Sequence, residues 1–136
     1  MPERIYIDTN IYLDYFEERK DIFRPLGEFA FQVFKRTLEC EFEIVISDWV
    51  IEELSKQKFP KVKFDLLLRE LSNKGKIVKV RKTEQDLLNA RKYENFSDAI
   101  HGFIAHRTNC KKIVTRNIED FLDIRHFIEP ILPENL

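Results

Sequence analysis

Short apolar runs rich in β-branched and aromatic residues alternate with longer segments of helical periodicity, and this alternation constrains the fold more than any other feature. The predicted strands cover residues 4–8, 43–47, 76–80, 112–115 and 127–132. The predicted helices cover about 10–18, 25–40, 48–57, 60–73, 83–93 and 97–108. Strands that alternate with helices favour a mainly parallel sheet with helices on both faces. We therefore expect an α/β fold, built as a three-layer α/β/α sandwich.

The chain of 136 residues fits one domain, 1–136, because it contains no repeat, low-complexity tract or linker. Hydrophobic residues make up 43% and charged residues 35%, a balance that excludes a disordered tail. No apolar run approaches the roughly 20 residues of a membrane helix, and no signal peptide is visible. Cys40 and Cys110 form no CxxC motif, so we expect reduced thiols in a cytoplasmic protein and no zinc site.

Polar residues stand where three of the predicted strands end. Asp8 ends the first strand, Ser47-Asp48 the second, and Thr115-Arg116-Asn117 a later one. In open parallel sheets, binding sites form outside the carboxyl ends of the strands. We therefore expect these residues to gather at one edge of the sheet.

Glu53 lies within the predicted helix 48–57. At about 100° per residue, Val50, Ile51 and Leu54 form its buried face, and Glu53 falls at the edge of that face. A glutamate there usually has a partner, because burying an unpaired charge is costly. A functional carboxylate and a surface salt bridge both fit this pattern.

The predicted helix 97–108 places a second acid and a histidine near its start. Asp98 lies on a different side from the apolar residues of this helix, where it can cap the first turn or join a site. His101 follows three residues later and can be its neighbour. Two interpretations of His101 remain: a proton relay or phosphate contact, and a half-buried histidine bonded to a nearby acid or carbonyl.

Positive charge is concentrated between residues 55 and 82, which hold ten Lys or Arg and two Asp or Glu. The block is either an ordinary solvated surface or the footprint of a polyanion. If it contacts phosphates, neutralising Lys74, Lys76 and Lys79 should weaken binding and its salt dependence.

The predicted helix 25–40 is apolar over a wider arc than one buried face requires. It is either wedged into the core or exposes a patch that binds a second subunit or a partner helix. The apolar residues of this segment are Phe23, Leu26, Phe29, Ala30, Phe31, Val33, Phe34 and Leu38.

Five short motifs occur in an order and spacing that resemble the PIN-domain family, especially its small VapC-type toxins. They are Asp8-Thr9-Asn10, Ser47 six residues before Glu53-Leu54, Asp98-Ala99-Ile100, Thr115-Arg116-Asn117 with Asp120-Phe121, and Ile131-Leu132-Pro133-Glu134. The resemblance covers Arg4 to Glu134. It implies a metal-dependent endoribonuclease of cytoplasmic RNA that is able to form a homodimer and, as a toxin, to bind an antitoxin protein.

The resemblance also implies roles for individual residues. Asp8, Glu53 and Asp98 correspond to the acids that gather around Mg²⁺ or Mn²⁺, and Asn10, Thr115 and Arg116 to positions near the substrate. Many relatives carry a fourth acid where this chain has Asn117, an uncharged ligand. Asp120, three residues later, either supplies the missing carboxylate or only caps the following helix.

Carboxylates crowded together repel one another, so their convergence predicts a cation among them. Two other functions compete with the nuclease. A HAD-type phosphatase also begins with an aspartate after a strand, but it needs a second acid where this chain has Asn10. A PIN domain that has lost activity and serves as a binding module is suggested by Asn117.

Overall fold

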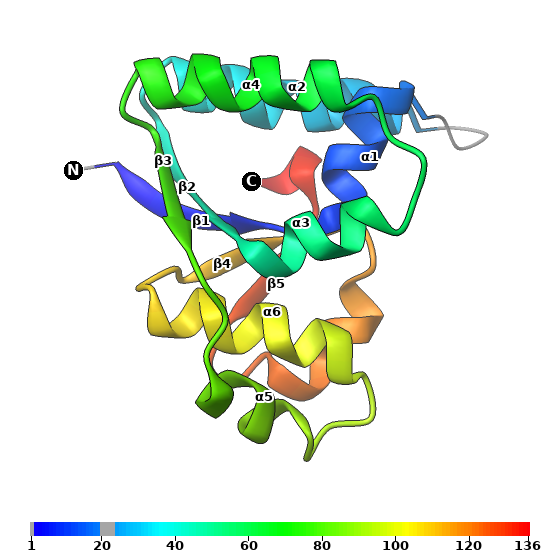
Figure 1. The fold of residues 1–136 in the computed structure, drawn as a ribbon, viewed down its shortest axis with the longest axis vertical. Coiled ribbons are helices and arrows are strands. Elements are labelled where there is room, and N and C mark those ends of the chain that lie inside the picture. The colour runs from blue at the N-terminus through cyan, green and yellow to red at the C-terminus, as the bar shows by residue number, and fades with distance from the viewer. Residues whose placement is uncertain (1, 20–23) are drawn as a thin grey trace.

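The computed structural model describes residues 2–19 and 24–136 and confirms the α/β fold (Figure 1). The strands are β1 (Glu3–Ile7), β2 (Phe42–Ser47), β3 (Ile77–Val80), β4 (Lys112–Val114) and β5 (Glu129–Ile131). The α-helices are α1 (Thr9–Glu17), α2 (Leu26–Leu38), α3 (Asp48–Ser55), α4 (Lys61–Asn73), α5 (Glu84–Ala90) and α6 (Phe96–Arg107). Two short 3-10 helices, η1 (Ile118–Ile124) and η2 (Pro133–Asn135), lie outside the predicted helical ranges.

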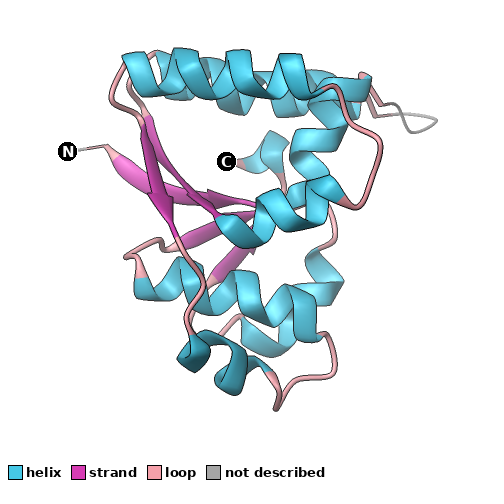
Figure 2. Ribbon diagram, viewed as in Figure 1, coloured by secondary structure: helices cyan, strands magenta, loops and turns pink. Residues whose placement is uncertain are grey.

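The strands form one parallel sheet between two layers of helices. Helices α1, α2 and α4 lie on one side of the sheet, and α5, α6 and η1 lie on the other (Figure 2). The strand order is β3-β2-β1-β4-β5, and every neighbouring pair is parallel. The three-layer sandwich and its mainly parallel sheet were therefore predicted correctly.

The order of the strands places a crevice beside β1. From β1 the chain builds outward through β2 and β3 on one side, and through β4 and β5 on the other. Such a reversal opens a crevice at the carboxyl ends of the two strands that flank it, here β1 and β4. Asp8 follows β1 and Thr115 follows β4, so the topology brings these two residues to the same crevice.

Helix α2 is mostly buried. Leu26, Ala30, Val33 and Phe34 lie in the core, whereas the side chain of Phe31 is 39% exposed. The wide apolar arc of this helix thus reflects a position between the sheet, α1 and α4 more than an open patch. The apolar segment also included Phe23, which lies outside the described residues.

Helix α3 corrects one prediction. Val50 and Leu54 are fully buried as expected, but Ile51 is 44% exposed. Ile51 lines a shallow groove with Lys79, Val80 and Arg81, at the edge of the sheet formed by β3. A helix of eight residues that packs at the end of a sheet buries a narrower face than its apolar pattern suggests.

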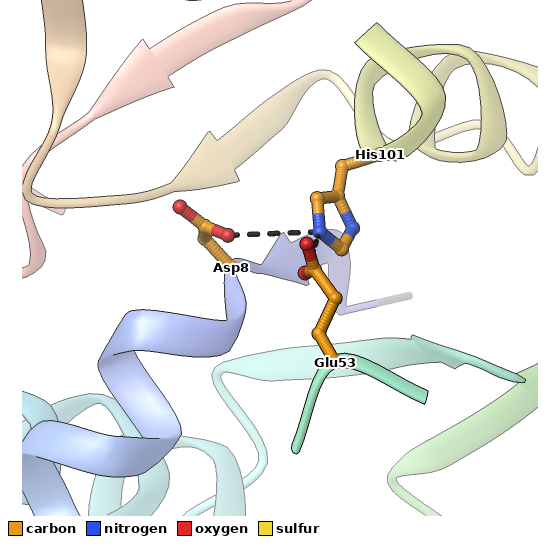
Figure 3. A group of neighbouring side chains, drawn as sticks. All are labelled: Asp8, Glu53 and His101. Carbon is orange, nitrogen blue, oxygen red and sulfur yellow. Dashed lines mark hydrogen bonds and ion pairs between the residues drawn. The ribbon is translucent and has the colours of Figure 1, made fainter. Parts of the chain in front are cut away.

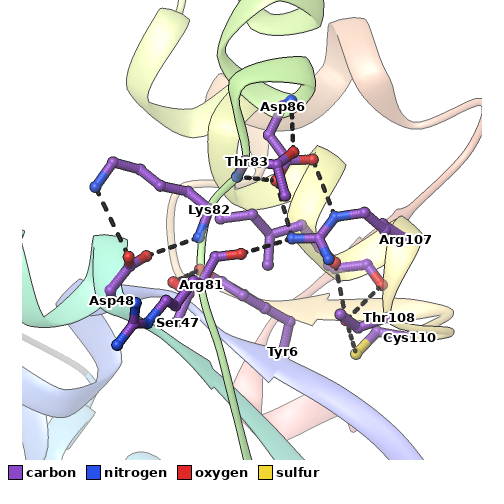
Figure 4. Close-up of polar contacts among 12 residues, drawn as sticks. Tyr6, Ser47, Asp48, Arg81, Lys82, Thr83, Asp86, Arg107, Thr108 and Cys110 are labelled. Atoms are coloured by element: carbon purple, nitrogen blue, oxygen red, sulfur yellow. Dashed lines mark hydrogen bonds and ion pairs between the residues drawn. The ribbon is translucent and has the colours of Figure 1, made fainter.

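A polar network fixes the turn from β3 into α5 (Figure 4). The backbone N–H of Lys82 donates to Asp48 Oδ1 at 2.8 Å, which ties the turn to the first residue of α3. Asp86 is buried and forms a capping box with Thr83 at the start of α5. Arg107 donates to Asp86 Oδ2 at 2.9 Å, so α5 is anchored to the end of α6.

The sequence predicts no membrane-spanning helix and no cysteine zinc site. Within the described residues, no helix is both long and apolar enough to cross a bilayer. The two cysteines are free, with Cys110 buried and Cys40 exposed.

Candidate metal centre

Asp8 anchors the centre at the carboxyl end of β1. It is the N-cap residue of α1, and its Oδ1 accepts a hydrogen bond from the backbone N–H of Thr9 at 2.8 Å. Its Oδ2 accepts one from Thr115 Oγ1, also at 2.8 Å. Burial raises the pKa of Asp8, opposed by the nearby His101 and by the hydrogen bond from Thr115. The carboxyl is thus held rigidly in a place where its own negative charge is unfavourable.

Glu53 reaches the same place from α3. Its Oε1 accepts a hydrogen bond from Thr9 Oγ1 at 2.7 Å and lies 2.6 Å from His101 Nε2. Burial alone would raise the pKa of Glu53, but the hydrogen bonds from His101 and Thr9 outweigh it and lower this pKa. Glu53 is therefore the acid of the centre that is held in its ionised form.

His101 completes the cluster and was not among the predicted ligands. Its side chain is fully buried, Nδ1 lies 2.6 Å from Tyr6 Oη, and Nε2 lies 3.8 Å from Asp8 Oδ1. One ligand atom each from Asp8, Glu53 and His101 lies within 4.8 Å of the others (Figure 3). These three residues have the geometry of a metal-binding group.

The burial of His101 follows from the packing of α6. Gly102, the next residue, faces η1 so closely that a Cβ there would lie 2.2 Å from Ile124 Cδ1. A larger residue would displace the side chain of Ile124. Helix α6 is thus buried toward both the sheet and η1, which explains why residues on the expected polar side, including His101, Gly102 and Ala105, are inside.

Asp98 lies beside the cluster on the first turn of α6. Burial and the negative charge of Asp8 raise its pKa to about 7, with further contributions from Asp120 and Glu53, and His101 opposes them. Within the described residues, no side-chain hydrogen bond from the N-cap residue Asn95 caps this helix. Asp98 therefore belongs electrostatically to the centre, although it lies outside the group formed by Asp8, Glu53 and His101.

Asn117 and Asp120 lie farther from the cluster. Both are exposed and line a groove of about 370 Å³ together with Arg24, Arg116 and Leu132. The backbone N–H of Asn117 donates to Thr115 Oγ1 at 3.1 Å, so this residue is linked to Asp8 through Thr115. Asp120 is not part of the group of three, but its charge acts on Asp98.

Two of the three residues predicted to contact substrate, Thr115 and Arg116, form side-chain contacts within the protein. Thr115 is fully buried and its hydroxyl holds Asp8. The guanidinium of Arg116 donates to the buried Asp14 at 2.9 Å and forms an ion pair with it. Asn10 is half-buried, and its Oδ1 is buried with no hydrogen-bond partner among the described residues. Thr115 thus holds Asp8 in place, and Arg116 pairs with Asp14.

Positive charge near the centre comes from one part of the basic block. Lys56 and Lys82 place their Nζ atoms 5.5 and 5.6 Å from the ring centroid of Trp49, and that ring lies 6.4 Å from the ring of His101. Lys74 and Lys76, by contrast, precede β3 and lie at the amino end of the sheet. The two ends of the basic block therefore lie at opposite ends of β3, and only the end that holds Lys82 is at the carboxyl end of the sheet.

The residues present fit a hard divalent cation. Carboxylate oxygens from Asp8, Glu53 and Asp98 are the ligands that such ions prefer, and the raised pKa values of Asp8 and Asp98 show negative charge that a cation would relieve. The unpartnered Oδ1 of Asn10 is a further buried oxygen without a hydrogen-bond donor.

Sequence reasoning found the acids and missed their supports. Asp8 and Glu53 meet as expected, whereas Tyr6 and Thr9 were not assigned to the site. His101, for which a site role and a histidine bonded to a nearby acid were both open, is buried and lies 2.6 Å from Glu53 Oε1. One signal was present for Tyr6, because side chains two residues apart on a strand face the same side of a sheet. A scan against models of known protein families and a search among curated proteins both found no match for this chain.

Proposed function

We propose that this protein is a metal-dependent endoribonuclease with a PIN-like active site. The observation that carries the proposal is the meeting of Asp8 and Glu53 in one partly buried cluster, with Asp98 close enough for its pKa to respond to both. Acids from three distant parts of the chain rarely share a buried position unless a cation compensates their charges.

Each acid has a role that follows from its environment. Asp8 and Asp98 would hold Mg²⁺ or Mn²⁺. Asp8 is fixed by hydrogen bonds from Thr9 and Thr115, and a cation would offset the negative charges that raise the pKa of Asp98. A bound ion of this kind neutralises a phosphodiester and lowers the pKa of a coordinated water. Glu53 stays ionised and half-exposed, so it can orient an attacking water and accept its proton.

RNA as the substrate rests on the resemblance to PIN domains. Lys56, on the side of Trp49, is a cation of the basic block placed to meet a phosphate chain near the centre, whereas Lys82 on the same side is paired with Glu52 and Asp48. A toxin role with an antitoxin partner rests on the same resemblance. Its test is the genomic neighbourhood, where a small antitoxin gene should adjoin this one.

The central experiment measures cleavage of single-stranded RNA with Mg²⁺, with Mn²⁺ and with EDTA. We expect cleavage that requires a divalent cation and is lost in Asp8→Asn. The matched control is Asp65→Asn, which makes the same change on the exposed side of α4 and should leave cleavage intact. A pure, folded protein that cuts no RNA with either cation would contradict the proposal and favour the binding module suggested by Asn117.

A further inference from the structure

A continuous chain of buried hydrogen bonds runs from the sheet to Glu53. Ser47 Oγ lies 2.6 Å from Tyr6 Oη, Tyr6 Oη lies 2.6 Å from His101 Nδ1, and His101 Nε2 lies 2.6 Å from Glu53 Oε1. Ser47, Tyr6 and His101 are all completely buried. Each of their polar atoms must therefore find its partner inside the protein.

The hydrogens along this chain can be assigned by counting donors. Ser47 Oγ already accepts the backbone N–H of Val50 at 3.2 Å, at the N-cap of α3, which leaves its own hydrogen free to donate. That hydrogen goes to Tyr6 Oη, the single hydrogen of Tyr6 goes to His101 Nδ1, and Nε2–H goes to the Glu53 carboxylate. In this arrangement every donor and acceptor of the chain is satisfied.

A metal bond to Nε2 would require the hydrogen of His101 to be on Nδ1, with every hydrogen bond of the chain reversed. This reversed arrangement is unfavourable both at Glu53 and at Ser47. Glu53 Oε1 lies 2.6 Å from Nε2, which leaves no room for a cation between the two atoms, so a free lone pair on Nε2 would face the ionised oxygen directly and place two acceptors in contact. The hydrogen would move to Nδ1, Tyr6 would donate to Ser47, and the Ser47 hydrogen would have no acceptor left in the chain. A doubly protonated imidazole still carries a hydrogen on Nε2. Nε2 therefore donates to Glu53 whether His101 is neutral or charged.

We propose that His101 is a positioning residue for Glu53 and not a metal ligand, and that Tyr6 and Ser47 fix its Nε2–H tautomer. This inference rests on the proposed function in taking Glu53 as a residue of the metal centre. It has a consequence for the cation, because the protein ligands are then oxygen atoms alone. Such a set suits Mg²⁺ and Mn²⁺, whereas a set that includes imidazole also suits zinc.

Long-range ¹⁵N–¹H spectra of the imidazole rings test the tautomer directly. The protein has three histidines, and His106 and His126 are exposed and serve as internal references. The signal that disappears in His101→Gln identifies His101. We expect a hydrogen on Nε2, both with EDTA and with saturating Mg²⁺. A hydrogen on Nδ1 alone in either sample would overturn the proposal, and the spectra require no cleavage of RNA.

The variant Tyr6→Phe tests the positioning role. It removes the donor to Nδ1, so His101 keeps its hydrogen on Nε2, opposite Glu53, but loses the partner that holds its ring in place. Mg²⁺ binding by calorimetry should therefore weaken about tenfold, as is typical for loss of a group that orients a metal site. Tyr12→Phe is the matched control, because Tyr12 is also fully buried and its hydroxyl has no partner among the described residues.

The two proposals fail in different ways. If Tyr6→Phe leaves the Mg²⁺ affinity at the wild-type value, the positioning role is wrong even for an active nuclease. If the wild-type protein binds no Mg²⁺ and cuts no RNA, the proposed function is wrong, and the tautomer of the metal-free protein still decides the assignment of His101.

Discussion

Asp98→Asn should stabilise the cation-free protein at alkaline pH. In the folded chain, Asp98 is partly buried and close to the negative charges of Asp8, Asp120 and Glu53, which raise its pKa, and His101 opposes them. Its carboxylate form is therefore less stable in the folded state than in the unfolded chain. Asparagine has nearly the same shape and removes that negative charge.

The magnitude follows from the shift of the pKa. A rise from 3.8 to about 7 corresponds to roughly 4 kcal/mol, at about 1.4 kcal/mol for each pKa unit. Asp98 is partly open to solvent, which screens the neighbouring charges, so about half of this, ~2 kcal/mol, is the expected gain. A gain of that size raises the unfolding temperature by about 6 °C in a chain of this length.

The sign of the pH dependence is fixed by the direction of the shift. Below pH 3.8 Asp98 is protonated in both states and contributes no difference in stability. As the pH rises, the unfolded chain ionises first, and the penalty on the folded state grows until the folded pKa of about 7 is passed. The advantage of Asp98→Asn should thus be complete at pH 8 and much smaller at pH 4, where this carboxyl is only partly ionised in the unfolded chain.

Urea unfolding in EDTA at both pH values measures this advantage, with the exposed substitution Asp65→Asn as control. Saturating Mg²⁺ at pH 8 should then stabilise the wild-type protein more than Asp98→Asn, because the cation removes the same repulsion. Equal or lower stability of Asp98→Asn at pH 8, or a gain that persists unchanged at pH 4, would refute the electrostatic reasoning.

Three further predictions concern the surroundings of the centre. Thr115→Val removes the hydroxyl that holds Asp8 and should weaken Mg²⁺ binding about tenfold in calorimetry, whereas Thr115→Ser should restore it. Lys56→Gln should reduce by about 1 the slope of log affinity against log salt for a single-stranded RNA, and Lys74→Gln, at the far edge of the sheet, should leave that slope unchanged. If α2 mediates a homodimer, Phe31→Glu should yield monomers in sedimentation experiments; a wild-type protein that is monomeric at high concentration would exclude the dimer.

The sequence located the elements and the acids because both depend on local patterns. Asp8 follows from an apolar strand that ends in a polar residue, and Glu53 from the edge of a helical face. Ile51 shows where a local pattern fails, since its exposure depends on which side of α3 other elements cover. The position of Lys74 likewise became clear only once β3 was paired in parallel with β2.

The hydrogen-bond chain was beyond sequence reasoning for a different reason. Tyr6 and His101 are 95 positions apart, and no periodicity relates them. On α6, His101 falls at the margin of the apolar face. At that position the sequence pattern is the same whether the side chain is buried against a partner or exposed to solvent. Its burial depends on Gly102, which permits the close approach of η1. Such a contact is defined by packing among three elements.

The order in which the chain supplies the centre has a consequence for its synthesis. Asp8 emerges first from the ribosome, Glu53 and His101 follow, and Thr115, which holds Asp8, comes after about five-sixths of the 136 residues have been made. A nascent or truncated chain that ends before β4 lacks both the strand beside β1 and that hydroxyl. The complete centre therefore arises only once β4 and Thr115 have been made, and a fragment that ends before them holds Asp8 without these partners.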